Sequence, residues 1–241
     1  MDLSVLPVRT AGAAEHMAVD FLLLRRWPGP VAPRFRHYEW RGPAFTFGYG
    51  QKIAAVRAKL PVLDEVRLDL CRRPTGGGLV DHREDWTYAL VIPRGHPLEE
   101  TRATESYRIV HACIVAALQA QGVRARLATE ARPEGALHPS APHAGVCFEN
   151  PELHDVIAAD GRKIAGAAQK RTKQGLLFQG SIWRPAAGAA VDWERFEADW
   201  PALLAKELGG TAQPAGWPEF AEDEVEGLAD QYATPEWTEA R

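Results

Sequence analysis

The spacing of apolar residues along the chain predicts two long helices and a helical C-terminal part. Residues 14–27 carry a broad apolar face at helical spacing, and the Pro-Gly-Pro at 28–30 ends this segment. Residues 106–121 repeat apolar positions with the same period, and Gly122 follows them as the expected C-cap. The part that begins VDWERFEADWPALLAKELGG at Val191 is also expected to be mainly helical.

Short alternating runs between these helices predict strands. RFRHYEW and AFTFGYG flank the Arg-Gly-Pro at 41–43, which predicts a hairpin. Residues 65–73 alternate, with the valine and leucines on one side and Cys71 on the other, which predicts a half-buried strand. WTYALVIP, at 86–93, is expected to be another strand.

Two further strands are expected to pair through a tight turn. HDVIAAD and RKIAGAAQ, at 154–160 and 162–169, meet at the Asp-Gly of 160–161, a favoured pair for hairpin turns. LLFQGSIW, at 176–183, follows a polar turn as a third strand. Short strands of antiparallel type mixed with a few helices indicate an α+β fold, because a repeating βαβ pattern is absent from the sequence.

Length and composition are those of a soluble globular domain. The chain has 241 residues, of which 46% are hydrophobic, enough for one substantial core. We expect a single domain over 1–241, with its core at about 30–215 and a short, mainly helical C-terminal segment. Residues 129–146 contain three prolines and no periodicity, so we expect a mobile loop there.

Charge and cysteine content exclude several classes of function. The net charge is −4 and no basic tail is present, which argues against a general nucleic-acid binder. No apolar run is long enough to span a membrane, and the start lacks the pattern of a secretory signal, so we expect a cytoplasmic protein. Three cysteines make a poor disulfide framework. Without a CxxC or HExxH motif, no metal site is predicted.

A glycine block is the first candidate for a binding site. RRPTGGGLVDH, residues 72–82, places three consecutive glycines after two arginines. Glycines let backbone N–H groups approach a ligand closely, and the arginines suit a carboxylate, phosphate or thioester-bearing partner. The alternative is a flexible turn between two strands with its arginines in solvent. The block is neither a Walker motif nor a dinucleotide GxGxxG motif.

A lysine in the predicted hairpin is the second candidate. In DGRKIAGAAQ, strand alternation puts Lys163, Ala165 and Ala167 on one face and Ile164 and Gly166 on the other. A lysine beside such small residues suits a cleft with room for a ligand. The alternative is an exposed strand lysine.

Cys147, in GVCFENPELHD, is the candidate nucleophile. An ordinary thiol is only a few per cent thiolate at neutral pH, and a nearby ammonium such as that of Lys163 would favour the thiolate. The sixteen-residue separation across a hairpin permits this contact without requiring it. On spacing alone, the alternative for Cys147 is a structural or incidental residue, as Cys113 is in its apolar helix.

Together these segments resemble the lipoate–protein ligase and octanoyltransferase family, whose catalytic domain biotin protein ligases share. The glycine block, SYRIVHACIVAALQAQGV and GRKIAGAAQKR…LLFQGSIW carry the resemblance, which extends from MAVD (17–20) to GSIW (180–183). It implies a mixed β-sheet flanked by helices, the class II synthetase-like catalytic domain, with a tunnel for an eight-carbon acyl chain. It implies that Lys163 contacts the acyl carbonyl. The substrate-binding residues that it implies are Arg73, Thr75, Gly76, Gly77, Gly78, His82, Ala165, Gly166 and Gly180.

The family contains two chemistries. Ligases activate lipoate with ATP and Mg²⁺, whereas transferases take octanoyl from acyl carrier protein without ATP, in one branch through a cysteine. Cys147-Phe148 followed by Pro151 fits that branch. The resemblance therefore implies an octanoyl or lipoyl transferase with Cys147 and Lys163 as catalytic residues and no cofactor.

The resemblance also implies the partners of the reaction. The donor would be octanoyl-acyl carrier protein, and the acceptor a lysine of a lipoyl domain or of a glycine-cleavage H-type protein. The alternatives are an ATP-dependent ligase that forms lipoyl-AMP and a non-catalytic relative that binds acyl carriers. Two positions depart from the pattern: Gln179 stands where relatives often have histidine, and Arg83 where they have aspartate.

Overall fold

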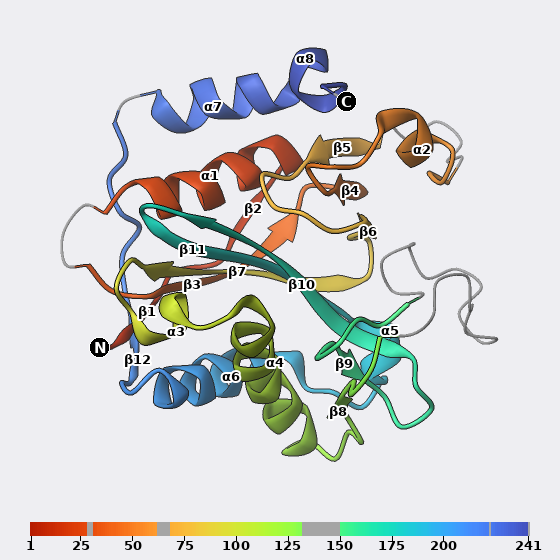
Figure 1. Cartoon of the computed structure of the whole chain (residues 1–241), viewed down its shortest axis with the longest axis vertical. Coiled ribbons are helices and arrows are strands. Elements are labelled where there is room, and N and C mark those ends of the chain that lie inside the picture. The colour runs from red at the N-terminus through yellow and green to blue at the C-terminus, as the bar shows by residue number, and fades with distance from the viewer. Residues whose placement is uncertain (28–30, 62–67, 132–149, 222, 241) are drawn as a thin grey trace.

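A large mixed sheet forms the centre of the computed structural model, which describes residues 1–27, 31–61, 68–131, 150–221 and 223–240 (Figure 1). The strand order is β12-β1-β3-β7-β11-β10-β9-β8, and β2 pairs with β3. Pairs among β1, β2, β3 and β12 are parallel, and the other pairs are antiparallel. The strands are β1 Leu3–Val5, β2 Arg9–Ala11, β3 Arg34–Trp40, β7 Asp85–Pro93, β8 Arg126–Leu127, β9 Val156–Ile157, β10 Lys163–Thr172, β11 Gly175–Trp183 and β12 Ala212–Pro214.

A second, three-stranded sheet has the order β5-β4-β6, and helices cover both sides of the large sheet. Its strands are β4 Ala44–Phe47, β5 Asp69–Arg72 and β6 Leu79–Asp81. α1 and α7 lie side by side on one side, whereas α4 and α6 cover the other (Figure 1). The helices are α1 Ala13–Arg25, α2 Ile53–Arg57, α3 Pro97–Glu100, α4 Ala103–Gln119, α5 Arg184–Ala187, α6 Trp193–Glu207, α7 Glu224–Ala233 and α8 Pro235–Thr238. The prediction of an α+β fold with a mixed sheet flanked by helices is confirmed.

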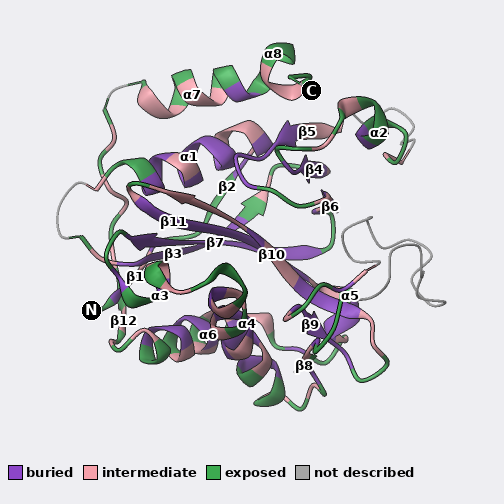
Figure 2. Cartoon of the chain, viewed as in Figure 1, coloured by how far each residue is buried: buried purple, intermediate pink, exposed green. Residues whose placement is uncertain are grey.

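Aromatic side chains fill the space between the large sheet and the helices α4 and α6. Trp86 and Tyr88 of β7 meet Phe196 and Trp200 of α6, and the Tyr88 and Trp200 rings pack edge to face with centroids 4.5 Å apart. Each of these side chains is almost fully buried, and burial of Phe196 alone contributes roughly 1.5–3 kcal/mol. Figure 2 shows β7 buried along its length. Leu3 of β1 belongs to the same core, which therefore begins well before residue 30.

The predicted hairpin at 41–43 is wrong. β3 belongs to the large sheet, whereas β4 pairs with β5 and β6 in the small one. Gly42, with φ of +96°, turns the chain from one sheet to the other. Phe45 and Phe47 of β4 are buried in a separate apolar cluster of the small sheet. The alternation of apolar and polar residues within one strand does not show which partner strand will cover its apolar side chains.

The other predicted elements differ mainly at their ends. α1 and α4 confirm the two long helices, and Gly122 takes the expected left-handed conformation, with φ of +83°. The pairing of β9 with β10 confirms the Asp-Gly hairpin. In β5 it is Cys71 that is buried, against α1 and α7, while Leu70 is only half-buried. The C-terminal part is mainly helical, but β12 extends the large sheet and residues 215–221 are neither helix nor strand.

Two predictions lie partly or wholly outside the described residues: the loop at 129–146, except for its first three residues, and the start of the strand at 65–73. Within the described ranges, none of the helices has the length and apolar character needed to cross a bilayer.

Candidate active site

A narrow cavity lies where the two sheets meet. β10 and β11 of the large sheet supply Lys163, Gly166, Ala167, Ala168, Gln179, Gly180 and Ser181 to its wall. The small sheet and its loops supply Thr46, Arg73, Gly77, Val80 and His82. The cavity thus brings together the predicted lysine, the glycine block and the histidine that ends it. Ala165 does not line it, because its side chain is fully buried in the core on the other face of β10.

Lys163 and Gly166 lie on the same side of β10, which contradicts the strand alternation expected from the sequence. A bulge between Lys163 and Ala165 shifts the register against β9 and brings the lysine onto the face of Gly166. The lysine amine lies over this glycine so closely that a Cβ there would be 2.7 Å from Nζ. Only 7% of the Lys163 side chain is exposed, so the exposed-lysine alternative is excluded.

Asp155 holds the amine of Lys163 in this position. Its Oδ2 lies 2.7 Å from Nζ, and the Asp155 side chain is also only 7% exposed. The backbone N–H of Glu152 donates to the same oxygen at 2.7 Å. Removal of either Lys163 or Asp155 would leave the other charge unpaired in a low dielectric, which is strongly destabilising.

His111 of α4 fixes the segment that carries Asp155. His154 has a left-handed backbone, with φ of 70°, and its carbonyl lies 2.7 Å from Nδ1 of His111. A carbonyl can only accept, so Nδ1 carries the proton. Burial lowers the pKa of His111, which keeps the ring neutral. Sequence reasoning missed Asp155; the hairpin that pairs β9 with β10 was the signal that it lies near Lys163.

The buried side chain of Arg73 holds the glycine loop, Gly76 to Gly78, in its conformation. Its Nη2 donates to the carbonyls of Gly76 and Gly78, at 2.8 and 2.9 Å, and the side chain is buried. Gly77 between them has φ of +88°, a conformation that glycine adopts without strain. The N–H groups of the three glycines donate to no described residue. The loop therefore turns its carbonyls toward the arginine and leaves its N–H groups for other acceptors.

Arg72 has a structural role, which corrects the expectation that both arginines face a ligand or solvent. Its guanidinium is fully buried and donates to the carbonyls of Tyr49, Gln51, Trp237 and Thr238, at 2.7 to 3.0 Å. A planar group with five donors suits several carbonyls at once. Arg72 thereby ties the small sheet to the C-terminal helix α8.

Thr75 and Gln179 connect the glycine loop to α1. The Thr75 hydroxyl donates to Oε1 of Gln179 at 2.8 Å, and Nε2 of Gln179 donates to Asp20 at 2.7 Å. Asp20 also accepts from the buried Arg36 at 2.7 Å. Burial raises the pKa of Asp20, and its donors act in the opposite direction. Gln179 thus satisfies both buried partners with one amide.

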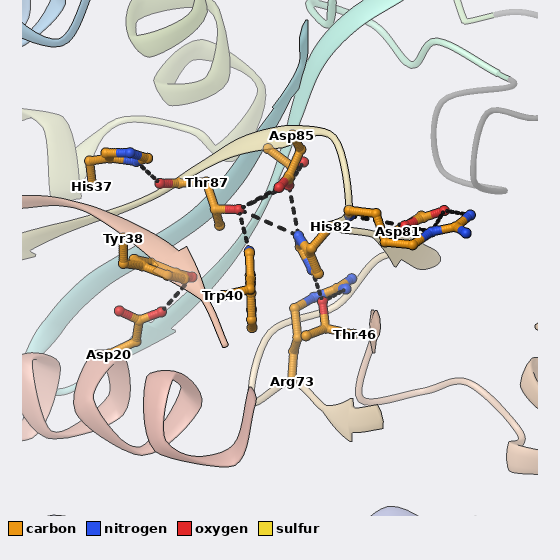
Figure 3. Close-up of polar contacts among 12 residues, drawn as sticks. Asp20, His37, Tyr38, Trp40, Thr46, Arg73, Asp81, His82, Asp85 and Thr87 are labelled. Carbon is orange, nitrogen blue, oxygen red and sulfur yellow. Dashed lines mark hydrogen bonds and ion pairs between the residues drawn. The ribbon is translucent and has the colours of Figure 1, made fainter. Parts of the chain in front are cut away.

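His82 lines the cavity and lies between Asp85 of the large sheet and Thr46 of the small sheet (Figure 3). Its Nδ1 is 2.7 Å from Oδ2 of Asp85, on β7, and its Nε2 is 2.7 Å from Oγ1 of Thr46, on β4. The ring of Trp40 stacks on the imidazole, with centroids 4.1 Å apart. Only 4% of the His82 side chain is exposed, so the ring has one fixed orientation.

Arg83 forms an ion pair with Asp81, to which its Nε and Nη2 donate. Figure 3 shows Asp81 near His82. The resemblance leads one to expect an aspartate directly after the histidine, but Arg83 stands there. Asp85, three residues after His82, provides the carboxylate that contacts the imidazole.

Gly180 has two roles at the site. It lines the cavity, and its missing side chain also makes room for the ring of Tyr88, which a Cβ would approach to 2.1 Å.

The predicted nucleophile, Cys147, lies outside the described residues. Within the described ranges, no group of three or more His, Cys, Asp or Glu side chains is arranged to hold a metal ion.

Comparisons of the sequence and of the structure with known proteins lead to the same family of enzymes. Residues 12–185 match the family model of the lipoyl protein ligase A/B catalytic domain. Octanoyltransferase LipM of Bacillus cereus is 36% identical over 174 residues, which cover 70% of this chain and 60% of that protein. The LipM of Staphylococcus aureus is 32% identical over 168 residues, with 69% and 60% covered. The chain thus matches about 60% of the length of these relatives.

Solved structures share the fold at lower identity. A lipoate-protein ligase A bound with ATP aligns with a TM-score of 0.70 and 18% identity, over 99% of both chains. A bi-partite lipoate protein ligase from Thermoplasma acidophilum aligns with a TM-score of 0.67 and 18% identity, over 99% of this chain and 96% of that one. These structures support the same arrangement of sheets and helices.

Proposed function

The chain belongs to the lipoyl protein ligase A/B family, and we propose that it is an octanoyltransferase that works through a thioester on Cys147. The donor is octanoyl-acyl carrier protein. The acceptor is a lysine of a lipoyl domain or of a glycine-cleavage H-type protein. The curated relatives named octanoyltransferase support this choice within the family, as does the Cys-Phe of 147–148 followed by Pro151.

The observation that carries the proposal is the buried amine of Lys163 in the wall of the cavity. An ammonium in a site with little water stabilises negative charge far more than it does in bulk solvent. Two such charges occur in acyl transfer: the cysteine thiolate and the oxygen of the tetrahedral intermediate. The ion pair with Asp155, at 2.7 Å, keeps the amine over Gly166 and inside the cavity.

The proposed reaction has two balanced steps. The Cys147 thiolate attacks the thioester carbonyl, a new C–S bond forms, the C–S bond of the donor breaks, and the carrier leaves as a thiolate. The lysine amine of the acceptor then attacks the enzyme thioester, an amide C–N bond forms as the nitrogen gives up a proton to a base of the site, and the C–S bond breaks to release Cys147 as thiolate. Donor and enzyme thioesters are nearly equal in energy, so the first step requires no ATP, and covalent catalysis divides one transfer into two easier ones.

The shape of the cavity suits a straight acyl chain. Gly166, Ala167, Ala168 and Gly180 present no side chain larger than a methyl group along β10 and β11. Met17 and Val80 add apolar surface from α1 and β6. In this proposal the N–H groups of Gly76, Gly77 and Gly78 help to hold the acyl oxygen. The cytoplasm, where thiols stay reduced and acyl carrier protein is present, is the proposed location.

The requirement for ATP distinguishes the proposed transfer from ligation. We expect the chain to octanoylate a lipoyl domain from octanoyl-acyl carrier protein without ATP. Modification that occurs only with free lipoate or octanoate, ATP and Mg²⁺ would instead identify a ligase. No modification under either condition would leave a carrier-binding role. Lys163→Ala should abolish transfer, and Lys173→Ala, an exposed lysine in the turn between β10 and β11, is the matched control.

A further inference from the structure

The hydrogen bonds around His82 have a fixed direction. The Asp85 carboxylate can only accept, so Nδ1 carries a proton and donates it to Asp85. When Nδ1 alone carries a proton, Nε2 accepts from the Thr46 hydroxyl. Thr46 itself accepts from Nη1 of Arg73 at 2.9 Å. Hydrogen bonds thus join Arg73, Thr46, His82 and Asp85 in series. In this series, Nε2 of His82 is the atom that can take up another proton.

The surroundings of Asp85 prepare it to balance a charge on His82. The carboxylate is fully buried and also accepts from the hydroxyls of Thr87, at 2.9 Å, and Ser181. Trp40 Nε1 donates to the same Thr87 oxygen at 2.8 Å (Figure 3). Three donors fix the carboxylate beside the imidazole, as the buried aspartate does in a catalytic triad.

This group lies beside the reacting centre of the proposed function. Ser181 pairs across the sheet with Gly166, the residue over which the Lys163 amine lies. Thr46, His82 and Lys163 all line the cavity between the sheets. His82 also lines a second, separate cavity of about 370 Å³, together with Asp85. A proton on His82 therefore has a second cavity through which it can leave.

We propose that Thr46 and His82 accept the proton that is released when the acceptor lysine attacks the enzyme thioester. As the C–N bond forms, an N–H proton of the amine moves to Oγ1 of Thr46, and the Thr46 proton moves to Nε2 of His82. Asp85 balances the imidazolium. The C–S bond then breaks, Cys147 leaves as thiolate, and the imidazolium releases its proton to water. This inference rests on the function proposed above and adds the base for its second step.

Neighbouring histidines are poorly suited to this role. Nε2 of His16 lies 2.8 Å from the carbonyl of Glu39, and burial lowers the pKa of His16 to about 3. His37 contacts the carbonyl of Thr87 through Nδ1, and burial lowers its pKa as well. Of the histidines that the structure describes, His82 alone pairs with a carboxylate.

Separate measurement of the two half-reactions tests the inference. Octanoyl-enzyme formation is followed by intact mass, and transfer from the preformed octanoyl-enzyme to a lipoyl domain is followed in a single turnover. In His82→Gln and Thr46→Val we expect transfer to be slowed on the order of 100-fold more than formation, the usual effect of losing a general base. Thr46→Ser, which keeps the hydroxyl, should restore transfer.

The control and the outcomes separate a proton relay from a structural role. His96→Asn, at the start of α3 and outside the cavity, should leave both steps unchanged. Equal slowing of both steps in His82→Gln and Thr46→Val, or transfer at the wild-type rate, would overturn the relay. Thr46→Val preserves the shape of the side chain, so it decides the question if His82→Gln does not fold. A wild-type enzyme that forms no octanoyl adduct would overturn the proposed function itself.

Discussion

At the scale of single residues, the position of the Lys163 amine depends on the absence of a side chain at Gly166. A Cβ at this position would lie 2.6 Å from Cε and 2.7 Å from Nζ of Lys163. The flexible end of the lysine would have to move, and its ion pair with Asp155 would break. We expect Gly166→Ala to lower the rate of transfer at least about 10-fold, the effect of roughly 1.4 kcal/mol in transition-state stabilisation.

A matched control distinguishes this effect from a general cost of replacing glycine. Gly50 has no atom near its Cβ position and an ordinary backbone, so Gly50→Ala should keep full activity. Steady-state transfer and thermal unfolding are measured for both variants. Full activity in Gly166→Ala would show that the exact place of the amine does not matter.

Among the elements, the small sheet depends on the C-terminal helix α8 through Arg72. This side chain donates to backbone carbonyls on both sides of the contact, at Tyr49 and Gln51 and at Trp237 and Thr238. Lysine has one charged nitrogen and cannot replace the planar fork. We expect Arg72→Lys to lower the free energy of unfolding by about 1–3 kcal/mol, because buried carbonyls lose their donor.

Limited proteolysis locates the effect of this substitution. In Arg72→Lys, cleavage near the C-terminus should become faster than in the wild type. Arg57→Lys is the control, since Arg57 contacts Glu239, the residue that follows α8, through an exposed pair that contributes little. Equal cleavage of both variants would mean that Arg72 does not hold α8.

The packing of α1 makes stability depend on pH. Burial lowers the pKa of His16 on this helix to about 3, whereas a histidine in the unfolded chain titrates near 6.5. Between these values the unfolded chain binds a proton that the folded protein does not. This contribution to stability is therefore complete above about pH 6.5 and decreases as the pH falls toward 3.

Urea unfolding at pH 7 and pH 5 measures this contribution. We expect the free energy of unfolding to fall on acidification, and the fall to be smaller in His16→Gln by at most about 1.4 kcal/mol for each pH unit. An identical fall in the variant would mean that His16 does not titrate in this way.

Element by element, the sequence predicted what depends on local pattern and missed what depends on distant partners. The helices α1 and α4 and the hairpin of β9 and β10 follow from apolar spacing and from the Asp-Gly turn. The assignment of β4 to its own sheet depends on a cluster around Phe45 and Phe47 that no local signal reveals. The bulge after Lys163 moved this lysine to the face opposite the predicted one, because one extra residue changes a two-residue period.

The whole molecule brings the candidate site together from segments far apart in the chain. Motifs selected Lys163, Arg73, the glycines and His82, and the structure places Lys163, Arg73, Gly77 and His82 around one cavity. Asp155, Asp85 and Thr46 escaped notice because their importance comes from contacts across strands. A carboxylate or hydroxyl carries no sign of its partner until the sheets are assembled.

Intact mass spectrometry of the protein after incubation with octanoyl-acyl carrier protein, without ATP, tests the central claim most directly. We predict a mass increase of one octanoyl group that hydroxylamine removes and that Cys147→Ala does not show. Octanoylation of a lipoyl domain by Cys147→Ala at the wild-type rate would contradict this claim.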